Sequence, residues 1–75
     1  MNREFNVIVE KDEDGIYIGS VPELPGCHTQ ASTLDELQER IKEAIELYLE
    51  ANEKELSDPI KFIGIQRVEV TIEKA

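Results

Sequence analysis

The sequence predicts an α+β domain in which an antiparallel sheet of three or four strands carries one long helix on one face. Apolar residues alternate near both ends of the chain, an Asp-Gly step typical of a β-hairpin lies near the start, and apolar residues recur at helical spacing in the middle. The 75 residues suffice for one domain with one core. We therefore expect a single domain over residues 1–75 with the element order β-β-β-α-β.

The first two strands are expected to form a hairpin. Phe5, Val7 and Val9 occupy alternate positions, which places them on one face of a strand. Gly15 then provides the positive φ that a tight turn needs. The chain turns back here, and residues 16–21 are the second strand, with β-branched and aromatic residues on both faces.

A rigid, protruding loop is expected after the second strand. Pro22 and Pro25 lack the backbone N–H that a sheet uses, and Gly26 follows them. Residues 27–31 are predicted to be a short third strand that closes a meander.

The helix is expected to begin at a capping box. Thr33 can cap the first turn, and the side chain of Glu36 can reach back to the backbone of the cap. Pro59, after Ser57 and Asp58, ends any continuation. Over the five to six turns that we expect, apolar side chains recur on one face of the helix: Leu34, Leu37, Ile41, Ala44, Ile45, Tyr48 and Leu49.

The last predicted strand covers residues 61–73. Its apolar side chains change parity, since Ile63 and Ile65 are odd-numbered and the later ones are even-numbered. An unbroken strand would point the two sets to opposite faces. We therefore predict a bulge or a break at Gln66-Arg67.

One helix cannot cover both faces of this sheet. Apolar residues that include Ile8, Tyr17 and Val21 are expected on the second face. Two interpretations carry equal weight. The chain is a homodimer or higher homo-oligomer that covers this face, or these are the scattered exposed apolar residues of any protein surface.

Composition and charge disfavour direct nucleic-acid binding and a membrane segment. Seventeen acidic residues against eight basic ones give a net charge of −9, which disfavours direct binding of nucleic acid. The charge suits a basic protein partner, or serves solubility alone. The longest apolar runs are three residues, and the first five residues resemble no export signal, so we expect a cytoplasmic protein without a membrane segment.

No pattern in the sequence points to catalysis, a cofactor or a metal. The acids before Gly15 resemble half of a calcium loop, but the twelfth position of that loop would be Val21 where a glutamate is required. Cys27 and His28 are adjacent on a predicted strand, so their side chains point to opposite faces and cannot share a metal ion or form a catalytic pair. We therefore predict that the protein is not an enzyme.

A row of glutamates is expected along the helix, opposite its apolar face. Neighbouring members lie three or four residues apart, so each repels the next, at a total cost of about 1 to 2.5 kcal/mol before screening. Arg40 and Lys42 relieve part of this repulsion. A solvated face is one interpretation, and a binding surface for a basic partner is the other. The row comprises Glu36, Glu39, Glu43, Glu46, Glu50 and Glu53.

Three stretches of the chain resemble the N-terminal domain of the HicB antitoxin family. They are Asp14-Gly15-Ile16-Tyr17, then Val21-Pro22-Glu23-Leu24-Pro25-Gly26-Cys27, then Thr29-Gln30-Ala31-Ser32-Thr33-Leu34-Asp35-Glu36-Leu37. The resemblance implies a partial RNase H-like fold without catalytic activity. It also implies that the protein neutralises a HicA toxin, which is a small, basic, RNA-cleaving protein. An acidic inhibitor suits such a toxin by charge complementarity.

The resemblance assigns most of the motif to shape and a few residues to contact. The structural positions are Gly15, Pro22, Pro25, Gly26, Thr33 and Glu36. For contact with a toxin we predict Glu23 and Leu24 in the loop, and Glu39, Glu43 and Glu46 on the helix. Many HicB proteins add a C-terminal DNA-binding domain, whereas this sequence stops after a predicted strand, so operator binding is not expected.

Two other functions are compatible with the sequence. The first is a stand-alone oligomeric adaptor or small-ligand-binding module without a toxin partner. The second is a residual RNase H-like nuclease, which would need clustered carboxylates and a divalent metal.

Overall fold

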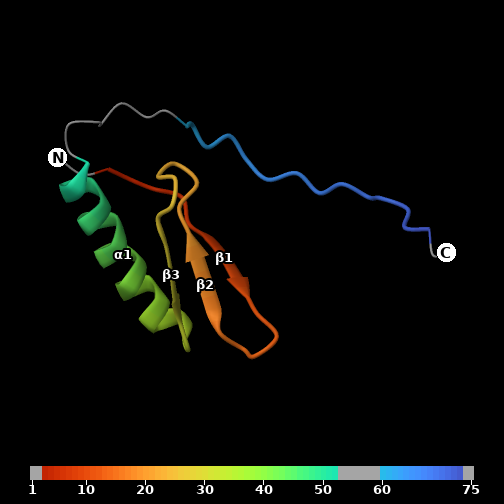
Figure 1. Ribbon diagram of the computed structural model, residues 1–75, viewed down its shortest axis with the longest axis horizontal. Helices are drawn as coiled ribbons and strands as arrows, with labels where there is room; N and C mark the ends of the chain where they lie inside the picture. Colours follow the sequence, from red (N-terminus) through yellow and green to blue (C-terminus); the bar gives the residue numbers. More distant parts are fainter. Residues whose placement is uncertain (1–2, 53–59, 74–75) are drawn as a thin grey trace.

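The computed structural model describes residues 3–52 and 60–73. It confirms the α+β class and the order of strands and helix over the first of these ranges. Strands β1 (Ile8–Lys11), β2 (Tyr17–Ser20) and β3 (His28–Ala31) form an antiparallel sheet in the order β1-β2-β3, and helix α1 (Leu34–Ala51) lies against one face of it (Figure 1).

The β1–β2 hairpin closes as its sequence predicts. Lys11 lies opposite Tyr17 at the end of the ladder, and the Asp12 N–H donates to the Ile16 carbonyl at 2.9 Å. The carboxylate of Asp12 accepts from the N–H groups of Asp14 and Ile16, both at 2.9 Å. Gly15 has a φ of 83°, in the region that glycine adopts without strain. The aspartate therefore organises the turn through the backbone.

One of the two hydrogen bonds of the predicted capping box is present at the start of α1. Thr33 has extended backbone angles, and its hydroxyl accepts from the Glu36 N–H at 3.1 Å. The Glu36 carboxylate forms other contacts instead of the predicted return bond to the cap. It accepts from the Ser32 hydroxyl at 3.4 Å and pairs with Arg40 at 2.6 Å. A cation one turn along the helix is the stronger partner for this carboxylate.

We expect Thr33→Ala to lower the free energy of unfolding by about 1 kcal/mol, because the Glu36 N–H loses its acceptor at the helix end. Urea unfolding followed by circular dichroism measures the change. Thr33→Ser keeps the acceptor and is the matched control. Equal losses in the two variants would contradict a capping role.

The core lies between α1 and the sheet. Leu37 and Ile41 are buried on the helix, and the next two turns are half-buried. Gly19 of β2 allows the close approach, since a Cβ there would lie 3.4 Å from a methyl carbon of Leu37. Leu34 departs from the predicted apolar face. Its side chain is 54 % exposed and lies outside the buried face of the helix.

Two residues predicted for the second sheet face lie on the helix side. Val21 is 3 % exposed and belongs to the core cluster, and Tyr17 has the same strand parity as Gly19, which contacts the helix. Ile8 stays on the second face by the same parity rule. The surplus of apolar side chains on that face is therefore smaller than predicted.

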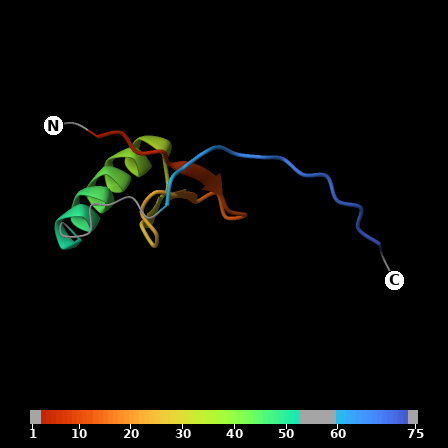
Figure 2. The ribbon, with the colours of Figure 1, turned by 90° about the horizontal axis from the view of Figure 1, so that it is seen from above.

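Residues 60–73 do not add a fourth strand to this sheet. They are extended, form no ladder with the three described strands, and run away from the domain (Figures 1 and 2). The break at Gln66-Arg67 stays a prediction, because no partner strand defines a register there. Ser57, Asp58 and Pro59, the predicted stop signal, lie outside the described residues. Within the described ranges, no helix is long and apolar enough to cross a membrane.

Candidate protein-binding surface

The loop between β2 and β3 is built from two consecutive turns. The Leu24 N–H donates to the Val21 carbonyl at 3.1 Å, and the Cys27 N–H donates to the Leu24 carbonyl at 2.9 Å. The Val21 N–H closes the loop on the Cys27 carbonyl at 3.0 Å. Side chains at these three positions are all buried, so the loop turns an apolar side toward the core.

The side chain of Leu24, which was predicted to contact a partner, is buried in this loop. Its side chain is only 6 % exposed and lies in the core cluster, whereas the sequence predicts that the rigid loop presents it to a partner. The reason is the spacing of three residues between Val21, Leu24 and Cys27, which brings all three to the inner side of the double turn. Pro25 and Gly26 form the exposed rim.

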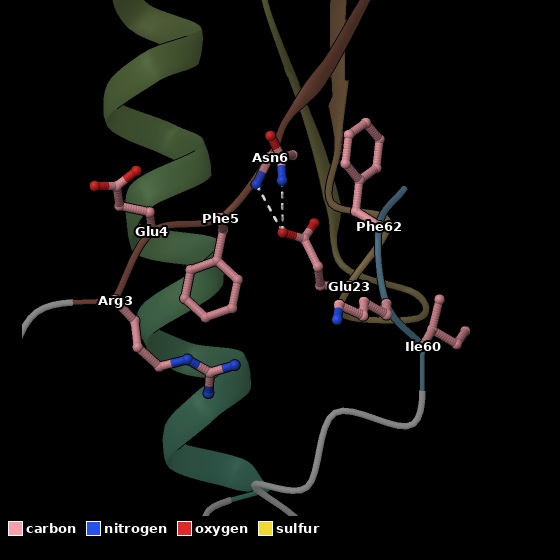
Figure 3. A pocket seen from close by; sticks show the side chains of 8 residues that line it. Arg3, Glu4, Phe5, Asn6, Glu23, Ile60 and Phe62 are labelled. Atoms are coloured by element: carbon pink, nitrogen blue, oxygen red, sulfur yellow. Dashed lines mark hydrogen bonds between the residues drawn. The ribbon is translucent and has the colours of Figure 1, made fainter. Parts of the chain in front are cut away.

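Glu23 also serves the fold. One of its carboxylate oxygens accepts from the backbone N–H of Asn6 at 2.9 Å and from the Asn6 side-chain amide at 3.0 Å (Figure 3). The pair ties the loop to the segment before β1, 17 residues away. The side chain is half-buried beside a cavity of about 340 Å³, between residues 3–6 and 60–62. The structure therefore assigns Glu23 a loop-fixing contact.

Gly26 is the position in this loop where a side chain would be strained. Its φ is 84°, and a Cβ built there would meet nothing within 4 Å. We expect Gly26→Ala to lower the free energy of unfolding by about 1–2 kcal/mol, through backbone strain alone. Gly64→Ala is the matched control, because its Cβ also meets open space and its φ is not positive. Urea unfolding of both variants tests this; equal stabilities would show that the loop adapts.

The predicted acidic surface lies on the outer side of α1. Glu39, Glu43 and Glu46 are all exposed, and they span about 10 Å along the helix axis. Glu50 continues the row, and Glu53 lies outside the described residues. These side chains come from one rigid helix, so their spacing is fixed.

Glu36 does not belong to this free row. It pairs with Arg40, whose guanidinium also donates to the Gln30 carbonyl at 3.0 Å. The contact fastens the first turns of α1 to β3. It also relieves the like-charge repulsion at the start of the row, so the cost predicted for the full row is an upper limit.

Cys27 and His28 point away from each other. Cys27 is buried, and burial raises the pKa of its thiol, which favours the neutral form. His28 is exposed on the adjacent position of β3. Among residues 3–52 and 60–73, no group of three or more His, Cys, Asp or Glu side chains is arranged to hold a metal ion.

One feature of the surface has no counterpart in the predicted site. A groove of about 600 Å³ runs beside α1, between the helix and the segment before β1. Its floor is apolar, with Phe5, Ile41, Ile45 and Leu49, and its rim is charged, with Arg3, Lys42 and Glu46. The alternation of apolar residues predicted that these side chains face the core. It could not show that Phe5, Ile45 and Leu49 are only partly covered.

The chain is similar to known proteins over most of its length. The family described as the HicB-like antitoxin of bacterial toxin-antitoxin systems matches residues 5–73. A UPF0150 protein of Archaeoglobus fulgidus is 63 % identical over 67 residues, covering 89 % of this chain and 94 % of the relative. A UPF0150 protein of Synechocystis is 56 % identical over 71 residues, covering 93 % of this chain and all of the relative. A UPF0150 protein of Thermotoga maritima is 39 % identical over 67 residues, covering 88 % of each chain.

The family match runs through the hairpin, the double-turn loop, the capped helix and the extended segment after it. It covers nearly the whole chain, and the relatives are of similar length. The chain therefore belongs to the HicB-like antitoxin family.

Proposed function

We propose that this protein neutralises a small, basic HicA-type RNase by direct protein contact in the cytoplasm. The observation that carries the proposal is the family match over residues 5–73, together with a helix that presents a row of unburied carboxylates. The family membership also supports a non-enzymatic role.

The contact surface in this proposal is the outer side of α1. Glu39, Glu43 and Glu46 offer negative charge at fixed spacing on a rigid element. A protein that cleaves RNA needs a basic surface for the phosphates of its substrate. A complementary row of carboxylates can occupy that surface and exclude the RNA. Glu23 and Leu24 contribute indirectly to binding, because their contacts within the protein hold the shape of the loop between β2 and β3.

Co-expression with a HicA-type protein from the same genome tests the proposal. The expected result is restored growth of cells that the toxin alone arrests, and a single complex of both chains on a sizing column. A catalytically inactive toxin variant serves for the purification. Persistent growth arrest, with the two chains eluting separately, would refute the proposal and favour a stand-alone adaptor.

A further inference from the structure

Residues 60–73 expose more apolar surface than a monomer of this size accounts for. Five branched side chains are 72–85 % exposed: Ile63, Ile65, Val68, Val70 and Ile72. The segment is extended and points away from the domain (Figures 1 and 2). The radius of gyration is 15.2 Å, against about 11 Å for a compact domain of this length. A strand-like segment with apolar side chains normally has a partner.

The outer edge of β1 is free to receive a strand. The Asp12 N–H donates to the Ile16 carbonyl, so residues 8 and 10 point their backbone groups toward β2. The backbone groups of Val7, Val9 and Lys11 therefore point outward. In the part of the chain that the structure describes, no strand pairs with this edge.

The opposite edge of the sheet is less accessible. Gln30 of β3 points its carbonyl away from β2 by the same alternation, and Arg40 of α1 already donates to that carbonyl at 3.0 Å. The helix also packs mainly on β2 and β3. A strand added to the sheet would therefore join β1.

The groove lies on the side where an added strand would place its side chains. Val9 lies opposite Gly19, which faces the helix, and yet Val9 is 50 % exposed. Phe5, Ile45 and Leu49 are half-buried and line the groove beyond it. Alternate side chains of a strand next to β1 would cover these residues.

We infer that two copies of this chain exchange residues 60–73, each segment pairing with the outer edge of β1 in the other copy as a fourth strand. Residues 60–62 line one cavity with Asn6 and Glu23 of their own chain (Figure 3), and the rest leads away from its own β1 (Figure 1). A second copy is therefore the partner that the segment can reach.

Symmetric exchange makes this contact large enough for a stable dimer. The break predicted at Gln66-Arg67 would bring Ile63 and Ile65 to the same side as Val68, Val70 and Ile72. With that break, covering these five side chains in each of two strands removes on the order of 1,000 Å² of apolar surface from water. Backbone pairing and the covered groove add to it. Stable interfaces bury roughly 1,200–2,000 Å² in total. The homo-oligomer predicted from the second sheet face would thus form through a strand edge instead.

The test compares two charge insertions at adjacent positions of the full chain. Val70→Asp puts a carboxylate on the apolar side of the segment, and Thr71→Asp puts the same charge on the other side. Sedimentation equilibrium is expected to give a dimer at about 10 µM for the wild type and Thr71→Asp. Val70→Asp is expected to dissociate at least about 100-fold more readily. Both side chains are exposed in the single chain, so neither substitution disturbs its core.

Hydrogen exchange adds a readout of the edge itself. The amides of Val9 and Lys11 are expected to exchange slowly in the wild-type dimer and quickly in Val70→Asp. A monomeric wild type at 200 µM would overturn the inference, whether or not those amides are protected, and so would equal effects of the two substitutions. The assay needs no toxin, so its outcome is independent of the proposed function.

Discussion

Leu37→Ala is expected to lower the free energy of unfolding by about 3–5 kcal/mol, enough to unfold much of this small domain at 37 °C. Leu37 is 2 % exposed and is the most deeply buried large side chain among the described residues. The cavity cannot collapse easily, because Gly19 lies opposite and has no side chain to move into it. Denaturant unfolding at 25 °C measures the loss.

Leu47→Ala is the matched control for that substitution. It removes the same atoms from the same helix, but Leu47 is 66 % exposed, so we expect a change within about 0.5 kcal/mol. Both variants change helix propensity in the same way. Similar losses in the two variants would show that the contact between α1 and β2 does not hold the fold.

Reversing the acidic row should affect binding as strongly as Leu37→Ala affects stability. The triple variant Glu39→Lys, Glu43→Lys and Glu46→Lys changes only exposed side chains of α1, so the fold is expected to remain stable. It places like charges against a basic partner, which costs several kcal/mol. We expect affinity for a HicA-type RNase to fall at least about 100-fold, equal to roughly 2.7 kcal/mol. Isothermal titration calorimetry at low salt measures it.

Local patterns predicted most of the fold. The Asp12–Gly15 turn and the Thr33 cap report on neighbouring residues, and the structure confirms both. The alternation of Phe5, Val7 and Val9 is confirmed only in part, because Phe5 and Val7 pack against the core but lie before β1, and Val9 is 50 % exposed. Such features depend on backbone geometry within a few residues. They can therefore be read without knowing where the rest of the chain lies.

Features that depend on distant contacts were harder to predict. The two prolines predict a protruding loop that presents Leu24 to a partner, whereas the double turn folds this side chain inward. The contact of Glu23 with Asn6 spans 17 residues and leaves no local signal. The Glu36 carboxylate pairs with Arg40 instead of the backbone N–H of the cap, because these two partners compete for the same carboxylate.

The strand predicted over residues 61–73 shows a different limit of sequence patterns. Residues 61–73 have strand character, and the structure gives them extended geometry without a partner among the described strands. A periodic pattern shows that a segment needs a covered face. It does not show whether the same chain or a second copy covers that face.

The most direct test of the account compares the triple helix variant with a control of equal charge. Glu10→Lys, Glu13→Lys and Asp14→Lys reverse three exposed acids around the β1–β2 hairpin and change the net charge by the same amount. Calorimetry with a HicA-type RNase is expected to show near wild-type affinity for the hairpin variant and at least about 100-fold weaker binding for the helix variant. Equal affinities of the two variants would show that the outer side of α1 is not the binding surface.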